Sequence, residues 1–380
     1  MYYHAFLVSR ELGGAALLAL RLAKWMSQQG ATPQVWIPGT GRASQTTEQE
    51  GLPWKSYDLD AIQKGNLTHA LACLRLVPRI QFRRGWAHVH NPLVYRMLRP
   101  VLRLAGLRTA VTVHIDPTPE DIRWAFRDPP DLVMPCARYM SDLIRQALGE
   151  AGQKLRITAV PNAVDTERFL PGDRLAAKQR LGAPAERPLA LMMANLAPHK
   201  GQETAIRAVA ELKSRGTDVE CWLAGVERDG RQEYEQRLRA LAVEGGVGDR
   251  VRFLGFRTDG PELLRAADFL LLPSTHEGLP LSIVEAQATK VPVLAAPTAG
   301  IPEVIKDGET GFLIPAADAV GYANRIEQLL RHPDLRQRIT EEAFARITRD
   351  STMPAYCKRV EELLQELTPR RDPASVLVRS

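Results

Sequence analysis

The stretch "DFLLLPSTHEGLPLSIVEAQATKVPVLAA" (268–296) places two short apolar runs on either side of a segment with helical character. The runs 268–273 and 291–296 show no polar alternation, which is typical of strands buried on both faces of a parallel sheet. Between them, Pro280 is suited to begin a helix, because the N–H that proline lacks would have no partner in the first turn. The stretch therefore predicts a strand, a helix and a second strand of an α/β fold.

The same alternation of strands and helices recurs along the chain, in one series before residue 164 and another after residue 188. Two such series predict two Rossmann-like domains, residues 1–170 and 185–345, facing each other across a cleft that holds the ligand. Helical periodicity returns at 351–367, which we expect to pack on the first domain. The expected strands lie in "AFLVS" (5–9), "TPQVWIP", "AHVHNP", "TAVTVH", "LVMPC" and "ITAVPN" (157–162), and then in "LALMMANL", "VECWLAG", "RVRFLGF", "DFLLLP", "VPVLAAP" and "GFLIP".

The composition restricts the class of protein. With 380 residues, 45% of them hydrophobic and 25% charged, the chain has the composition of a two-domain globular protein. Its four cysteines lie far apart without a CxxC pair, which argues against a zinc site or a disulfide framework and for a reducing compartment. The sequence shows neither the pattern of a signal peptide nor about 18 consecutive apolar residues. We therefore expect a cytoplasmic protein.

Positive charge is concentrated in the first half of the chain. Residues 1–180 hold 24 Lys and Arg against 15 Asp and Glu, whereas the remainder carries a small negative charge. One interpretation is a solvated basic face; the other is attraction to an anionic surface, with acidic lipid ahead of nucleic acid, for which no binding signature appears. The apolar and basic segment 66–84, with Arg79, Arg83 and Arg84, is the expected membrane contact. Nine cations lie between Asp60 and Asp116 with no intervening acid: Lys64, Arg75, Arg79, Arg83, Arg84, Arg96, Arg99, Arg103 and Arg108.

Two glutamates, Glu277 and Glu285, flank the start of the expected helix. The first N–H groups of that helix, at 281–283, together with the positive end of its dipole, favour an anion. Carboxylates accept hydrogen bonds from sugar hydroxyls, so the arrangement suits a nucleotide-diphosphate sugar. The alternative is that one glutamate caps the helix and the other is exposed.

Other chemistries have weaker support. There is no GxGxxG after the first expected strand and no GxxxxGK[ST], which disfavours dinucleotide and P-loop sites. Asp58 and Asp60 form an isolated DxD, and His88 and His90 alternate onto one strand face without a third ligand nearby. We therefore expect no metal and no cofactor, with the histidines structural or lining the substrate.

Five segments of the second half carry a family resemblance: "NLAPHKG" (195–201), "VECWLAG" (219–225), "RVRFLGF" (250–256), "ADFLLLPSTHEGLPLSIVEA" (267–286) and "AGIPEVIKDGETGFLIP" (299–315). They resemble the family-4 (GT4) retaining glycosyltransferases, whose two-Rossmann-domain architecture is called GT-B. Segments of the first half resemble the same family more weakly: "ELGGAALLALRLAKWMSQQG", "VHNP", "TVHIDP" and "VPNAVDTERF".

The resemblance implies a role for each matching residue. Glu277 would bind the hydroxyls of the donor sugar, Glu285 the nucleotide ribose, and Lys200 the diphosphate. His114 would face the transferred sugar, and the backbone of Gly14 would approach the phosphates. The implied catalytic residues are Glu277, His114 and Lys200. The implied donor-binding residues are Gly14, Asn195, Lys200, Glu277, Gly278, Leu279, Leu281, Ser282 and Glu285.

The sequence departs from the family pattern at two positions. Asn195 stands where many members carry an arginine that shares the diphosphate, and Ala299 stands where a glycine is common. A methyl group at 299 is tolerated unless the backbone there needs a positive φ.

The implied activity is metal-independent transfer of a sugar from a UDP-, GDP- or ADP-sugar to a hydroxyl acceptor, with retention of configuration. A lipid or glycan at the membrane surface is one such acceptor. The alternatives are a non-catalytic sugar-nucleotide-binding partner and a GT-B-fold epimerase.

Overall fold

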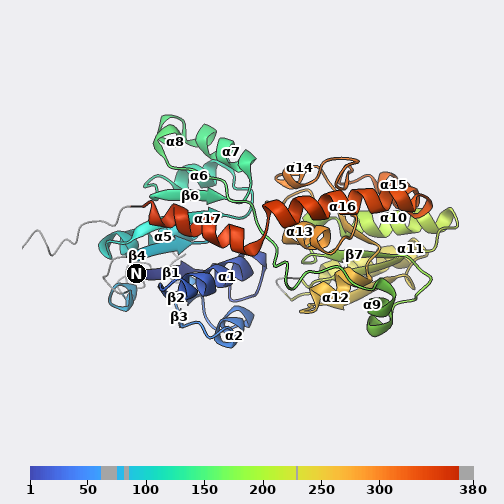
Figure 1. The fold of residues 1–380 in the computed structure, drawn as a ribbon, viewed down its shortest axis with the longest axis horizontal. Helices are drawn as coiled ribbons and strands as arrows, with labels where there is room; N and C mark the ends of the chain where they lie inside the picture. Colours follow the sequence, from blue (N-terminus) through green and yellow to red (C-terminus); the bar gives the residue numbers. More distant parts are fainter. Residues whose placement is uncertain (61–74, 81–84, 228–229, 368–380) are drawn as a thin grey trace, which may run out of the picture. The chain divides into compact units, whose positions relative to one another are not determined.

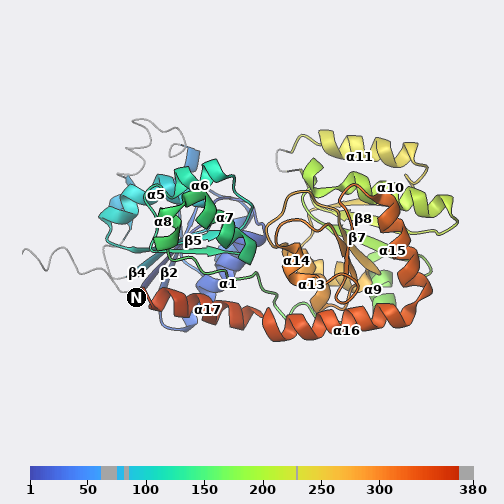
Figure 2. The same ribbon diagram turned by 90° about the horizontal axis from the view of Figure 1, so that it is seen from above.

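The computed structural model describes residues 1–60, 75–80, 85–227 and 230–367, and these form two compact units (Figures 1 and 2). Unit 1 comprises residues 1–162 together with the chain from Pro354 onward, and unit 2 comprises Ala163–Met353. Among the described helices, none has the length and apolar character that a membrane span requires.

Unit 1 is built on a six-stranded parallel sheet in the order β3-β2-β1-β4-β5-β6. This is the Rossmann order, in which the connection reverses direction between the first and fourth strands. The strands are β1 (Tyr2–Phe6), β2 (Thr32–Ile37), β3 (Trp54–Ser56), β4 (Gly85–Val89), β5 (Arg108–Val113) and β6 (Leu132–Pro135).

Helices connect these strands. In α1 the residues Leu18 and Leu22 are buried, and the helix is followed by Gly30, whose φ of 83° suits the residue after a helix end. The helical elements of unit 1 are α1 (Gly14–Gln28), α2 (Arg42–Gln49), the 3-10 turn η1 (Val77–Arg79), α5 (Pro92–Leu104), α6 (Pro119–Ala125), α7 (Arg138–Leu148), α8 (Glu150–Lys154) and α17 (Met353–Gln365).

Two sequence expectations in unit 1 were wrong in detail. The first strand covers Tyr2–Phe6 rather than 5–9, because its neighbours β2 and β4 pair with it only over that range. The segment 157–162 makes a single bridge, between Ile157 and Val133. Its neighbour β6 ends at Pro135, and a proline has no N–H with which to extend the ladder.

Helix α17 belongs to unit 1 although it follows unit 2 in the sequence, and it lies beside α1 in both views (Figures 1 and 2). The indole Nε1 of Trp25 in α1 donates to Glu361 Oε2 at 2.9 Å, and Arg156 forms an ion pair with Glu366. The apolar face of α17 is buried through Tyr356, Cys357, Val360, Leu363 and Leu364.

Unit 2 repeats the architecture of unit 1. Its parallel sheet has the order β12-β11-β10-β7-β8-β9, which is the same Rossmann order with its reversal between β7 and β10. The strands are β7 (Leu189–Met193), β8 (Glu220–Ala224), β9 (Val251–Gly255), β10 (Phe269–Leu272), β11 (Val293–Ala295) and β12 (Phe312–Leu313).

The helical elements of unit 2 include one in the segment 164–188 that separates the two sequence series. They are α9 (Arg174–Leu181), the 3-10 turn η2 (Pro198–Lys200), α10 (Gln202–Ser214), α11 (Glu233–Glu244), α12 (Gly260–Ala266), α13 (Leu281–Ala288), α14 (Ile301–Val304), α15 (Ala319–Arg331) and α16 (Pro333–Asp350).

A buried carboxylate fixes α9 and α16 to the start of the central strands. Asp268 is 4% exposed and lies within 2.8 Å of Lys178 Nζ, 3.0 Å of Arg174 Nη1 and 3.2 Å of Arg336 Nη1. It also accepts a hydrogen bond from the N–H of Leu189, at 2.9 Å. Burial opposes ionisation of Asp268, but the hydrogen bond from Lys178 and the charges of the three cations outweigh it and lower its pKa.

Replacing Leu364 with alanine tests the packing of α17. The side chain is fully buried, so Leu364→Ala should lower the stability of unit 1 by about 2–5 kcal/mol. Hydrogen exchange followed by mass spectrometry should show faster exchange in peptides of α1 and β1, with peptides of unit 2 unchanged. Lys358→Ala, on the exposed face of the same helix, is the matched control. Faster exchange confined to unit 2 would contradict this packing.

Candidate functional site

The loops that follow β7 and β10 meet at the point where the strand order of unit 2 reverses, which is where open α/β sheets bind ligands. The backbone of Gly201 approaches Pro273 so closely that a Cβ at 201 would lie 2.1 Å from the Pro273 carbonyl oxygen, and Gly201 has a φ of 76°. The N–H of Thr275 donates to the His199 carbonyl at 2.8 Å. Only glycine fits at position 201, and the two loops are held as one surface.

This contact brings together two of the residues that the sequence singled out. Lys200 Nζ lies 2.8 Å from Glu277 Oε1, and their side chains are 20% and 8% exposed. A cation and a carboxylate thus share one largely buried place at the carboxyl edge of the sheet. Lys200 contacts only one oxygen of Glu277, and Oε2 has no protein partner among the described residues.

Helix α13 begins directly after this pair, at Leu281, with Pro280 in an extended conformation before it. No side chain caps the helix, and its first turn contains no acidic residue. The N–H of Ile283 donates to the Pro280 carbonyl at 3.3 Å, so the expected three free N–H groups reduce to those of Leu281 and Ser282, which donate to no acceptor in the described chain. These two N–H groups and the helix dipole favour an anion at this point.

Both glutamates flanking the start of α13 are buried, so the alternative of one capping and one exposed carboxylate does not describe this site. Glu277 is 7% exposed and Glu285 is 9% exposed. Glu285 lies within α13, where its backbone carbonyl accepts a hydrogen bond from the Thr289 hydroxyl at 3.0 Å.

The loop after β11 supports the loop that carries Glu277. The N–H of Gly300 donates to the carbonyl of Gly278 at 2.9 Å, and the Thr298 hydroxyl donates to the carbonyl of Ser274, also at 2.9 Å. Ala299, between them, has a φ of 55°. From the sequence we expected a methyl group at position 299 to be tolerated unless the backbone there needs a positive φ. The structure shows that it does.

Asn195, in place of the usual arginine, is half-buried in the loop after β7. Its carbonyl accepts a hydrogen bond from Gln202 Nε2 at 2.9 Å, which ties this loop to the start of α10. Gly278 and Leu279 are buried beside Glu277.

In unit 1, His114 directly follows β5, and Gly14 is the exposed first residue of α1. The structure brings His114 together with His90, which directly follows β4: His114 Nε2 lies 3.2 Å from His90 Nδ1. Sequence analysis paired His90 with His88 and missed this contact. The sequence signal for this contact is that each histidine comes at the end of an expected strand. The pairing of β4 with β5, which brings the two ends together, is seen in the sheet.

Burial holds four described histidines of unit 1 neutral: His4, His88, His90 and His114. Burial lowers the pKa of His4 to about 4, with a smaller contribution from Lys55, and lowers the pKa of His88 to about 3, with a contribution from His114. It also lowers the pKa of His114 to about 4.

The structure places no further metal ligands beside Asp58 and Asp60 among the described residues. Asp58 and Asp60 are exposed, and the described residues contain no group of three or more His, Cys, Asp or Glu placed to hold a metal ion.

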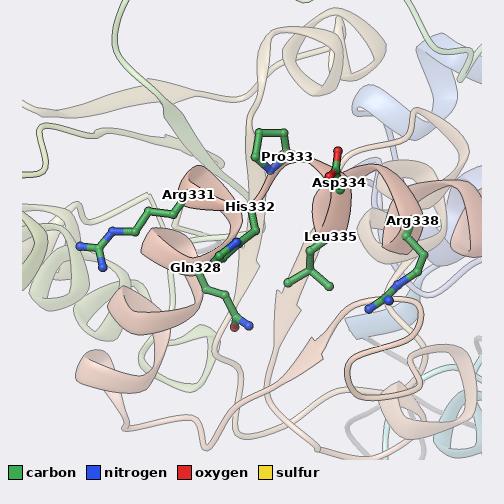
Figure 3. A pocket seen from close by; sticks show the side chains of 7 residues that line it. All are labelled: Gln328, Arg331, His332, Pro333, Asp334, Leu335 and Arg338. Atoms are coloured by element: carbon green, nitrogen blue, oxygen red, sulfur yellow. The ribbon is translucent and has the colours of Figure 1, made fainter.

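A hollow of about 560 Å³ lies elsewhere in unit 2, at the junction of α15 and α16 (Figure 3). Arg331 and Arg338 extend to opposite sides of it in Figure 3 and do not converge on a common point. It is open and lined by exposed side chains, so we place the candidate site at Lys200, Glu277 and α13.

Residues 173–346 match the family model of glycosyl transferases group 1. The matched residues include Lys200, Glu277 and Glu285, so the matched stretch contains the loops and the helix that form the candidate site.

The curated relatives that match this chain include glycosyltransferases. The D-inositol 3-phosphate glycosyltransferase of Stackebrandtia nassauensis is 32% identical over 233 residues, which are 58% of this chain and 52% of that protein. The lipopolysaccharide core biosynthesis glycosyltransferase LpsE of Rhizobium meliloti is 33% identical over 217 residues, 56% of this chain and 60% of that protein. The chain spans about half the length of the curated relatives it matches.

Solved structures confirm the expected GT-B fold of two Rossmann-like domains. HepE of Anabaena, in complex with UDP-glucose, superposes with a TM-score of 0.86 at 23% identity, covering 97% of this chain and 100% of that chain. The sucrose-phosphate synthase of Thermosynechococcus elongatus gives a TM-score of 0.81 at 18% identity, covering 96% and 98%.

Acid should destabilise unit 1 through its buried histidines. The buried histidines are neutral in the folded state but protonate near pH 6.5 when unfolded, so their stabilisation is complete above pH 6.5 and falls as pH drops toward 4. Each ring should cost at most about 1.4 kcal/mol per pH unit in that range. Hydrogen exchange at pH 7.5 and 5.5, corrected for intrinsic rates, should show lost protection in unit 1.

Unit 2 is the internal control for this effect, because its histidines His199, His276 and His332 are exposed. An equal loss of protection in both units would contradict the assignment to the buried histidines.

Proposed function

We propose that this protein is a retaining GT4 glycosyltransferase that transfers a sugar from a nucleotide-diphosphate sugar to a hydroxyl acceptor without a metal. The observation that carries the proposal is the Lys200–Glu277 pair beside the uncapped start of α13, at the strand-order reversal of unit 2. A lysine and a carboxylate side by side at a strand-order reversal suit a ligand that contains both phosphates and sugar hydroxyls. The group 1 family match over the same residues supports it.

Each group of the donor has a partner in this proposal. Lys200 and the N–H groups of Leu281 and Ser282 bind the diphosphate, Glu277 binds hydroxyls of the transferred sugar, and Glu285 binds the ribose. Asn195, Gly278 and Leu279 line the same part of unit 2, and Gly14 and His114 keep the donor-binding roles that the family resemblance implies. In this scheme residues 185–345 bind the donor and residues 1–170 bind the acceptor. The UDP-glucose complex of HepE leads us to propose a UDP-sugar first.

The chemistry then rests on stabilising the departing diphosphate. As the bond between the anomeric carbon and the diphosphate oxygen breaks, negative charge grows on that oxygen, and Lys200 and the α13 start offer fixed positive potential to it. The acceptor hydroxyl attacks from the leaving-group side, gives its proton to the departing diphosphate oxygen and forms the new glycosidic bond with retention. No side chain is assigned as a covalent nucleophile.

Donor binding must also reorganise the Lys200–Glu277 pair. Without a ligand, Lys200 is held by Glu277 at 2.8 Å. A diphosphate competes for the ammonium group, and Lys200 leaving Glu277 frees Oε1 for sugar hydroxyls. A nucleoside diphosphate without a sugar leaves Glu277 unpaired, which weakens the binding of the product relative to the donor.

Substituting the two glutamates separates their proposed roles. Glu277→Gln should reduce transfer from UDP-glucose by about 100-fold, since it removes hydrogen bonds to a charged group worth about 1.5–3 kcal/mol each. Its UDP affinity should be unchanged or tighter, because Lys200 is released. Glu285→Gln should instead weaken UDP binding by about 10-fold or more. Turnover is measured in EDTA by release of UDP and formation of the glycoside, and affinity by calorimetry.

Glu309→Gln, an exposed residue of the same unit, is the control for loss of a surface charge. Wild-type turnover in both glutamate variants would overturn the site. Activity that appears only on adding Mg²⁺ would overturn metal independence. Binding of UDP-sugars without transfer to any acceptor would favour a sugar-nucleotide-binding partner, and conversion of the donor to an isomeric UDP-sugar would favour an epimerase.

For the acceptor we propose a lipid or glycan at an anionic membrane surface. Arg75, Arg79 and Arg103 of the acid-free region are exposed, and Leu104 beside Arg103 is 64% exposed. Other members of that region are already paired: Arg99 lies 3.1 Å from Asp128, and Arg108 lies 2.6 Å from Asp131. Lys64, Arg83 and Arg84, and most of the segment 66–84, lie outside the described residues.

Vesicle sedimentation tests the membrane contact. The wild type should bind vesicles of acidic lipid at low salt and neutral vesicles weakly, since each cation near such a surface contributes about 1 kcal/mol. Arg79, Arg83 and Arg84 replaced together by Ser should lose most of this binding and keep UDP affinity. Replacing Arg207, Arg331 and Arg338 of unit 2 by Ser removes the same charge and is the control. Wild type that stays in the supernatant would favour a soluble acceptor.

A further inference from the structure

Three imidazole rings lie together at the carboxyl ends of β4 and β5 in unit 1. The ring centroids of His88 and His90 are 4.1 Å apart, and those of His90 and His114 are 5.5 Å apart with an interplanar angle of 15°. His88 is fully buried and His90 is 3% exposed, whereas His114 is half-buried. His114 is therefore the ring of this stack that a ligand can reach most easily.

The nitrogen atoms of the three rings differ in their partners. Both nitrogens of His88 are bonded, Nδ1 with the Tyr3 hydroxyl at 2.8 Å and Nε2 with the Thr112 hydroxyl at 2.6 Å. His90 Nδ1 and His114 Nε2 bond with each other at 3.2 Å. The remaining two, His90 Nε2 and His114 Nδ1, are buried without a partner among the described residues.

The hydrogen bond between His90 and His114 couples the tautomers of the two rings. Each neutral ring carries one proton, and one of the two bonded nitrogens must donate while the other accepts. If His90 Nδ1 donates, the proton of His114 is on Nδ1; if His114 Nε2 donates, His114 Nδ1 is a bare acceptor and the proton of His90 is on Nε2. One unpartnered donor and one unpartnered acceptor remain in either case.

A buried N–H without a partner is rarer and more costly than an unpaired acceptor, so the arrangement that places the N–H on the less buried ring is favoured. His90 Nε2 is deep in the unit, whereas His114 belongs to the half-buried ring. The donor therefore belongs on His114 Nδ1, which requires His90 Nδ1–H to donate to His114 Nε2.

We propose that His90 is a positioning residue that holds the ring of His114 in the Nδ1–H tautomer, so that His114 presents an N–H to an oxygen of a ligand bound at the carboxyl ends of β4 and β5. The identity of that ligand rests on the proposed function. The tautomer itself belongs to the ligand-free protein and can be tested without any donor.

The test is long-range ¹H–¹⁵N correlation NMR of the ¹⁵N-histidine-labelled protein without ligand, with kinetics on the same variants. Wild-type His114 should show a protonated Nδ1 and an unprotonated Nε2. His90→Phe keeps a ring in the stack but cannot donate, so His114 should shift toward the Nε2–H tautomer. Turnover should then fall about 10- to 100-fold with the KM for the donor within about threefold, as expected for a misoriented group.

His90→Asn is the conservative rescue, because its amide N–H replaces the Nδ1 donor and should restore the tautomer and most of the turnover. His88→Phe is the matched control, since it removes a buried imidazole of the same stack that does not bond to His114. It should leave the tautomer of His114 unchanged.

A wild-type His114 protonated on Nε2 would overturn the proposal, and this result does not depend on whether His90→Phe folds. An unchanged His114 tautomer in His90→Phe would also overturn it. An Nδ1–H tautomer that shifts in His90→Phe, in a protein that transfers no sugar, would uphold the positioning role while the proposed function fails.

Discussion

The close approach of Gly201 to the carbonyl of Pro273 is the constraint on which the candidate site depends. It joins the loops after β7 and β10, and a Cβ at position 201 would lie 2.1 Å from the Pro273 oxygen, so any other residue would push the loops apart. Lys200 immediately precedes this contact and Glu277 follows it by four residues, which places both side chains by backbone geometry. The long lysine side chain then needs little freedom to reach the carboxylate, and the backbone that carries both side chains is preorganised before a ligand binds.

Two of the buried carboxylates of unit 2, Asp268 and Glu277, differ in how completely their oxygens are paired. Asp268 is surrounded by Arg174, Lys178 and Arg336 and accepts a backbone N–H, so both of its oxygens are satisfied and it fixes the fold. Glu277 has the single cation Lys200 among the described residues and an oxygen without a protein partner. Removing ions from water is costly, and one cation returns only part of that cost. An incompletely satisfied carboxylate at a strand-order reversal is better explained by a ligand than by stability.

The apolar strands and the local pattern around Pro280 were enough to predict both sheets and the positions of Glu277 and Glu285 around a helix start, because parallel strands and helix starts have signals within about 15 residues. Lys200 was singled out only through the family resemblance. The short β3 was missed, and "ITAVPN" was taken for a strand, because the pairing partner decides whether such a segment joins the sheet. The contact of His90 with His114 joins two strands that are neighbours only in the folded sheet. The sequence around either histidine does not show that the two rings are in contact.

Ala299 shows how the site tolerates a departure from the family pattern. A left-handed conformation costs a non-glycine residue roughly 1–2 kcal/mol, yet Ala299 has a φ of 55°. Hydrogen bonds on either side of it, from Thr298 to Ser274 and from Gly300 to Gly278, hold its neighbours to the loop that carries Glu277. Strain of this kind persists only where the surroundings over-determine the backbone. The position of the Glu277 loop is therefore fixed from both sides, by Gly201 through Pro273 and by the segment around Ala299, and the carboxylate it carries is held rigidly where the ligand is expected.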